Sequence, residues 1–187
     1  MNARLSTETT ELAIAELKTL LGARASTGLS VLDLHAGDES HHDRHRPQIV
    51  VSPETTAEVA EIVKIAARYR VPITAFGAGS GLEGGAIPIQ GGISLDTARL
   101  DQIIEVRADD MIARVGAGVR RLDLTRVLRD TGLFFPVDPG ANASIGGMTS
   151  TGASGTYAVR YGVIRGNVPG LPVVPAVYSP SACVRSP

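Results

Sequence analysis

The alternation of apolar and polar positions predicts a helix near the start of the chain and a strand–helix–strand unit after it. Apolar residues recur at helical spacing over residues 8–21, and Gly22 follows them as a C-cap. The β-branched run Ile49–Val51 predicts a strand. The spacing of apolar residues from Val59 onward then predicts a second helix, which ends near Arg70.

The residues on either side of this second helix support its predicted start and end. Thr55 and Glu58 have the spacing of a capping box, which satisfies unpaired N–H groups at a helix N-terminus. Residues 71–76 predict a second strand. We expect it to run parallel to the first strand, because a right-handed crossover through a helix joins the two.

Shorter elements are predicted further along the chain. Three β segments are expected, at residues 93–95, 103–106 and 111–115. The last two are joined by a polar turn at residues 108–110. A helix is expected over residues 120–129, with Gly132 just beyond its end.

Two regions lack this periodicity. Residues 23–47 include a polar segment, residues 33–46, that holds all four histidines, and we interpret the region as a loop or linker. Near the other end, five of the eleven prolines lie at or after Pro169. Regular structure is not expected there, because proline removes a backbone donor.

Composition excludes several classes of protein. With 43% hydrophobic residues the chain can bury a core, so disorder throughout is excluded. The net charge of −1 gives no electrostatic basis for binding nucleic acid or a membrane surface. The single cysteine, Cys183, cannot form an internal disulfide, and no apolar run is long enough for a transmembrane segment. Residues 1–21 lack the features of a signal or transit peptide, so we expect a cytoplasmic protein.

A glycine-rich loop follows the second predicted strand. Residues 77–85 contain five glycines and no lysine. They match G-x-G-x-x-G, but the residues that follow cannot start a helix, which excludes a Rossmann site, and no Lys-Ser or Lys-Thr pair indicates a P-loop. Glycines would let the backbone N–H groups converge on an anion as a nest. The alternative is a long glycine-rich turn without a ligand.

A second tract of small residues lies at residues 134–156. Its glycine, serine, threonine and alanine residues offer hydrogen-bond donors and little bulk, which suits a dinucleotide laid against the backbone. The two tracts together indicate a dinucleotide site more specifically than either tract alone.

Five blocks carry a family resemblance, at residues 47–51, 76–84, 91–96, 131–140 and 146–162. Through them the chain resembles the flavin-binding domain of the vanillyl-alcohol-oxidase/PCMH type, and most closely the group that holds FAD-linked D-lactate dehydrogenase and the FAD-linked polypeptide of glycolate oxidase. The resemblance implies an α+β fold, a PCMH-type FAD-binding domain of two α/β subdomains with FAD between them. The second subdomain is expected to be incomplete. The implied organisation is an N-terminal helix and polar linker over residues 1–45, a truncated FAD-binding domain over 46–176, and an irregular tail over 177–187.

The resemblance also implies which residues bind FAD. One set resembles the family's pyrophosphate cradle and comprises Gly77, Ala78, Gly79, Ser80, Gly81, Leu82, Glu83, Gly84 and Gly85. The other resembles the strip that lines the cofactor toward the flavin ring and comprises Pro136, Asp138, Ser144, Ile145, Gly146, Gly147, Thr149, Ser150, Thr151, Gly152, Ala153 and Gly155.

The implied activity is that of an FAD-dependent oxidoreductase acting on CH–OH donors. Such an enzyme oxidises a small 2-hydroxy acid, D-lactate or glycolate, to the 2-oxo acid by hydride transfer to the flavin. No residue here is assigned as catalytic. The choice of hydroxy acid and the electron acceptor stay open.

The sequence departs from the family in two places. Tyr157 stands where the family usually has a small amide residue, and it either crowds the loop near the flavin ring or points outward. The resemblance decays after Asn167, as expected of a truncated or frameshifted gene, and the groups that bind the hydroxy acid are expected in the missing part. Two alternatives therefore stay open, a catalytically silent FAD-binding or nucleotide-binding fragment and a glycine-rich scaffold without a nucleotide.

The histidine-rich segment has a separate interpretation. His41, His42 and His45, with Asp38 and Asp43 nearby, include the side chains that zinc or manganese prefers. The segment has no helical periodicity that would place two of these histidines on one face. We therefore favour a solvated polar loop and assign no metal.

Overall fold

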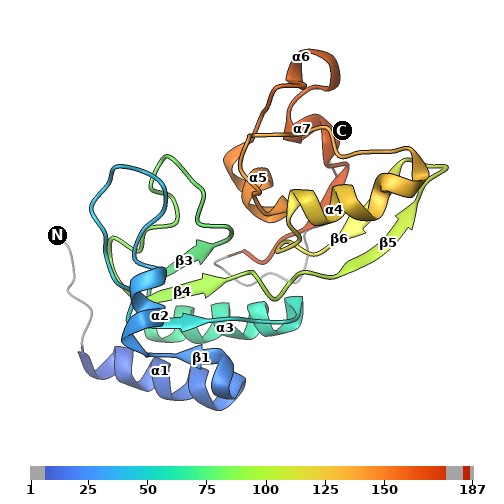
Figure 1. The fold of residues 1–187 in the computed structure, drawn as a ribbon. Helices are drawn as coiled ribbons and strands as arrows, with labels where there is room; N and C mark the ends of the chain where they lie inside the picture. The colour runs from blue at the N-terminus through green and yellow to red at the C-terminus, as the bar shows by residue number, and fades with distance from the viewer. Residues whose placement is uncertain (1–6, 176–182, 186–187) are drawn as a thin grey trace.

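The computed structural model describes residues 7–175 and 183–185, which fold into two adjoining halves (Figure 1). The first half consists of α1 (Thr7–Leu21), η1 (Gly22–Arg24), β1 (Ala25–Ser26), α2 (Leu29–Leu34), β2 (Ile49–Val51), α3 (Thr56–Tyr69), β3 (Ile73–Phe76) and β4 (Ile93–Asp96). The second half consists of β5 (Ile103–Arg107), β6 (Ile112–Val115), α4 (Arg121–Leu128), η2 (Arg129–Thr131), α5 (Ile145–Thr151), α6 (Ala158–Tyr161), α7 (Ile164–Asn167), β7 (Gly170–Pro172) and β8 (Cys183–Arg185).

A four-stranded sheet organises the first half, with the order β1–β2–β4–β3. Strands β2 and β3 both run parallel to β4, which lies between them, and β1 runs antiparallel to β2. The predicted parallel relation of the first two strands is confirmed. Because parallel strands end at one edge of a sheet, the loops after β3 and β4 leave from the same edge.

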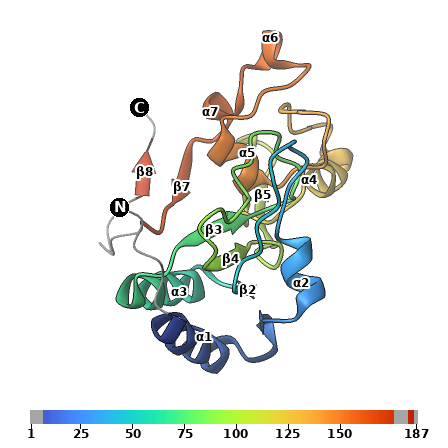
Figure 2. The ribbon, with the colours of Figure 1, turned by 90° about the vertical axis from the view of Figure 1, so that its left-hand side faces the viewer.

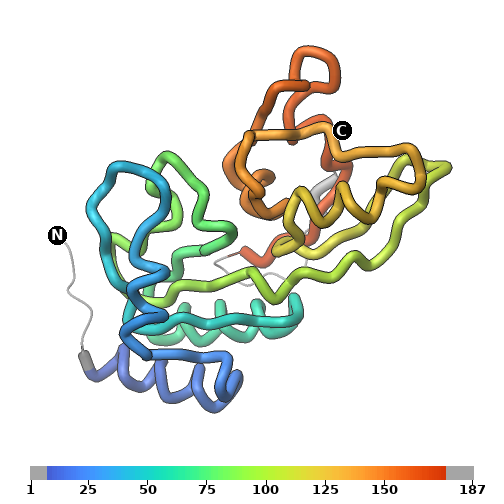
Figure 3. Tube along the Cα trace, in the orientation of Figure 1, coloured from blue at the N-terminus to red at the C-terminus, as the bar shows by residue number. Residues whose placement is uncertain are grey.

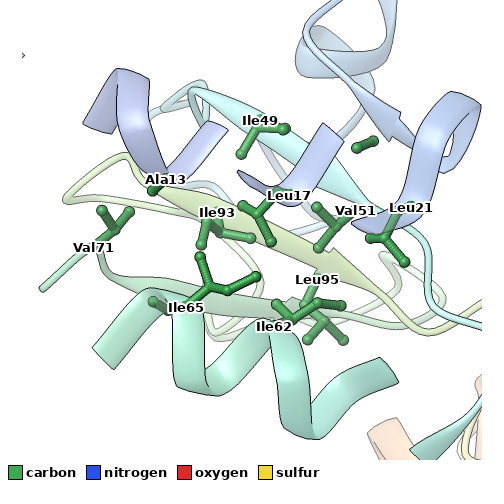
Figure 4. Packing of buried hydrophobic residues seen from close by; sticks show 12 residues of the cluster. Ala13, Leu17, Leu21, Ile49, Val51, Ile62, Ile65, Val71, Ile93 and Leu95 are labelled. Carbon is green, nitrogen blue, oxygen red and sulfur yellow. The ribbon is translucent and has the colours of Figure 1, made fainter. Parts of the chain in front are cut away.

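One hydrophobic core joins this sheet to α1 and α3, which cover one of its faces (Figures 1 and 4). Leu17 of α1, Ile62 of α3 and Ile93 of β4 are completely buried in it. The apolar spacing that predicted the two helices is therefore the spacing of their buried faces.

The start of α3 is fixed by its cap and by an ion pair. The Oγ1 of Thr55 accepts a hydrogen bond from the N–H of Glu58, as predicted. The Glu58 carboxylate accepts the N–H of Glu54. It also accepts hydrogen bonds from the two terminal guanidinium nitrogens of Arg24, at 2.7 and 2.6 Å. The hydrogen bond from Arg24 lowers the pKa of Glu58 to about 2.

The second half is built from short elements around two small clusters. The β5–β6 hairpin and α4 confirm the predicted strands and helix, and they pack around Val119, Leu124 and Leu128. A further cluster of Val137, Met148 and Ile164 lies under α5 and α7. Figure 3 shows how the chain passes from β4 into the hairpin and then returns through these short helices.

Two predictions of irregular structure are wrong, and one helix in the second tract was not predicted. Part of the supposed loop at residues 23–47 forms β1 and α2, and β1 adds an antiparallel edge to the sheet. The second tract contains the helix α5, whose N-terminus is capped by Ser144. Strand β7 pairs with β8, and Pro172 is tolerated because both strands of a two-stranded sheet are edges. Residues 177–182 and 186–187 of the expected tail lie outside the described residues.

Among the helices that the structure describes, none combines the length and the apolar character needed to cross a membrane.

Candidate functional site

The glycine loop at residues 77–85 follows β3 directly and leads into no helix. The next regular element is β4, so the Rossmann arrangement is absent, as expected. Gly79 and Gly84 have φ values of 69° and 73°, a conformation that residues with a side chain rarely adopt. Within the described residues, the backbone N–H groups of residues 78–85 donate no hydrogen bond to another protein group. These donors are therefore available to an anionic ligand.

The first loop touches the start of the second tract. A Cβ atom at Gly77 would lie 2.6 Å from the Oγ of Ser144 and 3.9 Å from the Cα of Gly147. A side chain at position 77 would therefore separate the two tracts. The structure brings together two segments that are more than sixty residues apart in the sequence.

The hydrogen-bond donors at the start of α5 are already used. The N–H groups of Ile145 and Gly146 donate to the carbonyls of Val119 and Ala117, and that of Gly147 donates to the Oγ of Ser144. The hydroxyls of Thr149, Ser150 and Thr151 donate to carbonyls within α5 and at its start. At these positions the donors are used within the protein itself, and the expectation that this tract supplies donors to a dinucleotide stays a prediction. Its small residues allow close approach.

The remaining residues of the second tract hold its backbone together. The carboxylate of Asp138 lies 3.3 Å from Arg121 and accepts the N–H of Gly140. A Cβ atom at Gly155 would lie 1.9 Å from the carbonyl oxygen of Asp138, so this glycine is required by packing. Pro136 is half-buried, Gly152 ends α5 in the left-handed conformation, and Ala153 packs in the Met148 cluster.

A cavity of about 490 Å³ opens beside the first loop. Its walls come from α2 and the polar segment after it, the ends of β3 and β4, and the start of α4. The residues that line it are Leu34, His35, Gly37, Asp38, Glu39, Arg44, Phe76, Gly77, Ala78, Gly79, Asp96, Ala98 and Arg120. A second cavity of about 300 Å³ shares Ala98 and Arg120 with it. The two cavities therefore adjoin, with Arg120 at their boundary.

The buried His35 and the partly exposed Asp96 both line this cavity. The Nε2 of His35 lies 3.4 Å from the carboxylate of Asp96, its Nδ1 lies 2.9 Å from the carbonyl of Val31, and its ring packs on Phe76. Burial alone lowers the pKa of His35, but Asp96 and the Val31 carbonyl outweigh it, so the pKa is raised above its ordinary value. A protonated His35 would leave the pair with Asp96 neutral overall.

Sequence reasoning missed most of the cavity residues, among them Arg44, His35, Asp96 and Arg120. Asp96 could have been found, because it stands at the carboxyl end of a parallel strand, where ligands bind in such sheets. The others come from segments that showed no motif. Their side chains meet only through the tertiary fold.

The histidine segment and Tyr157 are placed as follows. The rings of His41 and His42 stack at 4.6 Å, and a Cβ atom at Gly84 would lie 2.6 Å from the ring of His42. The polar segment therefore packs against the glycine loop. Tyr157 is 50% exposed and contacts Phe134 edge-on, which agrees with the interpretation that it points outward.

The chain is similar in sequence to a family of flavoprotein domains and to individual enzymes. The model of the FAD binding domain family matches residues 47–176. A probable mitochondrial D-lactate dehydrogenase of Danio rerio is 44% identical over 169 residues, which are 90% of this chain and 34% of that protein. The glycolate oxidase subunit GlcD of Bacillus subtilis is 35% identical, over 75% of this chain and 30% of that protein. The chain thus spans about a third of the length of the curated relatives it matches.

Solved structures show the same fold. An alkyldihydroxyacetonephosphate synthase superposes with a TM-score of 0.75 at 24% identity, over 83% of this chain and 34% of that one. The BBE-like 1 protein of Physcomitrella patens superposes with a TM-score of 0.76 at 24% identity, over 89% of this chain and 36% of that one. The predicted α+β fold of PCMH type is confirmed.

Proposed function

The chain belongs to the FAD binding domain family, and from this premise we propose that it binds FAD where its two glycine-rich tracts meet. We further propose that it is the FAD-binding part of a flavin-dependent 2-hydroxy-acid dehydrogenase of the D-lactate or glycolate type. Such an enzyme oxidises the hydroxy acid to the 2-oxo acid.

The contact of Gly77 with Ser144 and Gly147 carries this proposal. Two tracts that resemble separate parts of a dinucleotide site become one surface through it. The residues fit the cofactor in three further respects. Within the described residues, the N–H groups of residues 78–85 are unused, and Gly79 and Gly84 hold the positive φ that a tight backbone turn requires. A cavity of about 490 Å³ also adjoins the loop.

The residues of this chain hold the cofactor. The backbone of residues 78–85 donates to the diphosphate, and the small residues at the start of α5 let the cofactor lie close to the backbone. Bound FAD supplies the two-electron chemistry of the reaction. We assign no proton acceptor among the described residues.

The choice of a 2-hydroxy acid rests on the relatives. A probable D-lactate dehydrogenase and a subunit of glycolate oxidase are both more than a third identical to this chain over most of its length. Because the chain spans about a third of their length, a second candidate is an FAD-binding polypeptide without turnover of its own. The cytoplasmic location expected from the sequence stays a prediction.

Titration with FAD tests the binding proposal. The purified chain should bind FAD, seen as flavin absorbance that co-elutes with the protein. Gly81→Val should abolish binding, because the new side chain would project from the loop, 3.4 Å from the carboxylate of Asp38 at its Cβ. Gly166→Ala is the matched control, since no atom lies within 4 Å of the added Cβ. Equal FAD affinity in the wild type and Gly81→Val would contradict the assigned site.

Turnover separates the two candidate functions. With FAD bound, reduction of an artificial acceptor in the presence of D-lactate or glycolate supports the dehydrogenase. Binding without reduction under the same conditions supports an FAD-binding polypeptide without activity of its own.

A further inference from the structure

Two arginines from distant parts of the chain line the cavity beside the glycine loop. Arg44 lies in the polar segment between α2 and β2, and Arg120 lies at the N-terminus of α4. The loop itself has no basic residue, and Glu83 gives it one negative charge. Any positive charge at this site must therefore come from outside the loop.

Neither guanidinium is neutralised by a carboxylate within the part of the chain that the structure describes. Arg44 donates to the backbone carbonyl of Asp33, and Arg120 donates to that of Asn142 at 3.3 Å. Seven other described arginines pair with Asp or Glu, namely Arg24, Arg46, Arg68, Arg99, Arg107, Arg121 and Arg126. Of the described arginines without such a pair, only Arg44 and Arg120 line the cavity beside the glycine loop. Unpaired arginine in a cavity is typical of an anion-binding site.

The carboxylates of the cavity are partly occupied by other donors. Asp96 accepts the N–H of Ala98 and faces His35, and Asp38 accepts the N–H of Ser40. The Oδ2 of Asp38 has no hydrogen-bond partner in the described structure. Within the described residues, no ion pair joins Arg44 or Arg120 to Asp38, to Asp96 or to Glu39, the third carboxylate that lines the same cavity.

Arg120 also stands where the two tracts meet. Its backbone forms an isolated β-bridge with Ser144, whose Oγ in turn limits the space at Gly77. Arg120 lines both cavities. A ligand that runs from the glycine loop into the second cavity passes this guanidinium.

We propose that Arg120, together with Arg44, pairs with the diphosphate of the bound dinucleotide. This inference rests on the proposed function. The diphosphate of FAD carries two negative charges, and the donors at the start of α5 are already used within the protein. The backbone of the glycine loop would orient the diphosphate, and the two arginines would neutralise it.

Binding of FAD and of ADP to charge-neutral variants tests this pairing. ADP is a second probe because it keeps a diphosphate and lacks the flavin. Arg120→Gln and Arg44→Gln should each weaken the binding of both ligands by about tenfold, and the double variant should weaken it further. The affinity of each variant should also depend less steeply on salt concentration. Arg120→Lys should retain part of the affinity because it keeps the charge. Arg129→Gln is the matched control, since Arg129 is exposed on η2 and lies outside both cavities.

The outcomes distinguish this inference from the proposed function. Wild-type affinity and an unchanged salt dependence in Arg120→Gln and Arg44→Gln would overturn the inference while FAD binding stands. An equal loss in Arg120→Lys and Arg120→Gln with unchanged salt dependence would indicate a structural role and would also overturn it. Absence of FAD binding by the folded wild-type chain would overturn the proposed function itself. Thermal unfolding of each variant shows whether it is folded.

Discussion

The two halves of the molecule hold their parts of the site in different ways. The first half has a single core of twelve buried residues, in which two helices cover a sheet. The second half has two clusters of three buried residues each. The view in Figure 2 shows the same contrast, with α1 and α3 lying side by side beneath the sheet and the short helices spread above it.

Because of this difference, one part of the site is preformed and the other is only marginally stable. The glycine loop leaves the end of a strand in the larger core, so the sheet fixes its position. Helix α5 has seven residues and two glycines, which is too short to be stable by itself. We expect its order to depend on the clusters under it and on a bound ligand.

The largest expected effect is a loss of stability in the first half. Ile93→Ala removes a completely buried side chain from the central strand, and we expect a loss of about 2–5 kcal/mol. Met148→Ala, in a cluster of the second half, should leave the unfolding transition of the sheet largely in place. Urea unfolding followed by circular dichroism measures both. Equal shifts of one single transition would show that the two halves unfold as a unit.

A smaller effect is expected at the start of α3. Glu58→Gln removes the charge that pairs with Arg24, and we expect a loss of about 1 kcal/mol at pH 7. The pKa of Glu58 is lowered to about 2, so its contribution is complete above the unfolded pKa and disappears as the pH falls toward 2. The difference between wild type and variant should shrink over that range in urea titrations. A constant difference from pH 7 to pH 2.5 would contradict the ion pair.

The smallest effect concerns the pair of His35 and Asp96 at the cavity wall. The pKa of His35 is raised, so its protonation stabilises the fold below the unfolded pKa near 6.5. This contribution is lost as the pH rises through the folded pKa. Asp96→Asn should remove this pH dependence, whereas Asp123→Asn, which alters an exposed pair with Arg126, should keep it. An identical pH profile in both variants would show that Asp96 does not raise the pKa.

The sequence was sufficient for elements whose periodicity and caps agree. Helix α3 combines an apolar stripe with the Thr55 cap, and the structure reproduces it from Thr56 to Tyr69. Helix α5 was missed because its residues are small and show no apolar stripe, while its stability comes from the Ser144 cap and the buried Met148. Strand β1 was missed because two residues are too short for a pattern.

The candidate site likewise has residues that the sequence predicts and residues that it does not. The glycine loop was predictable because backbone geometry requires particular residue types at consecutive positions. Arg44 and Arg120 were not, because a charged side chain that lines a cavity shows the same local sequence as one on the surface. Their proximity to the loop depends on how the two halves pack.

Hydrogen exchange of the amides of α5, measured with and without FAD, is the most direct test of the idea that FAD joins a preformed loop to a marginal helix. The amides of α5 should exchange rapidly without FAD and slow markedly at saturating FAD, while those of β2 and β4 should be well protected in both states. Strong protection of α5 in the FAD-free protein, or exchange that saturating FAD leaves unchanged, would contradict it.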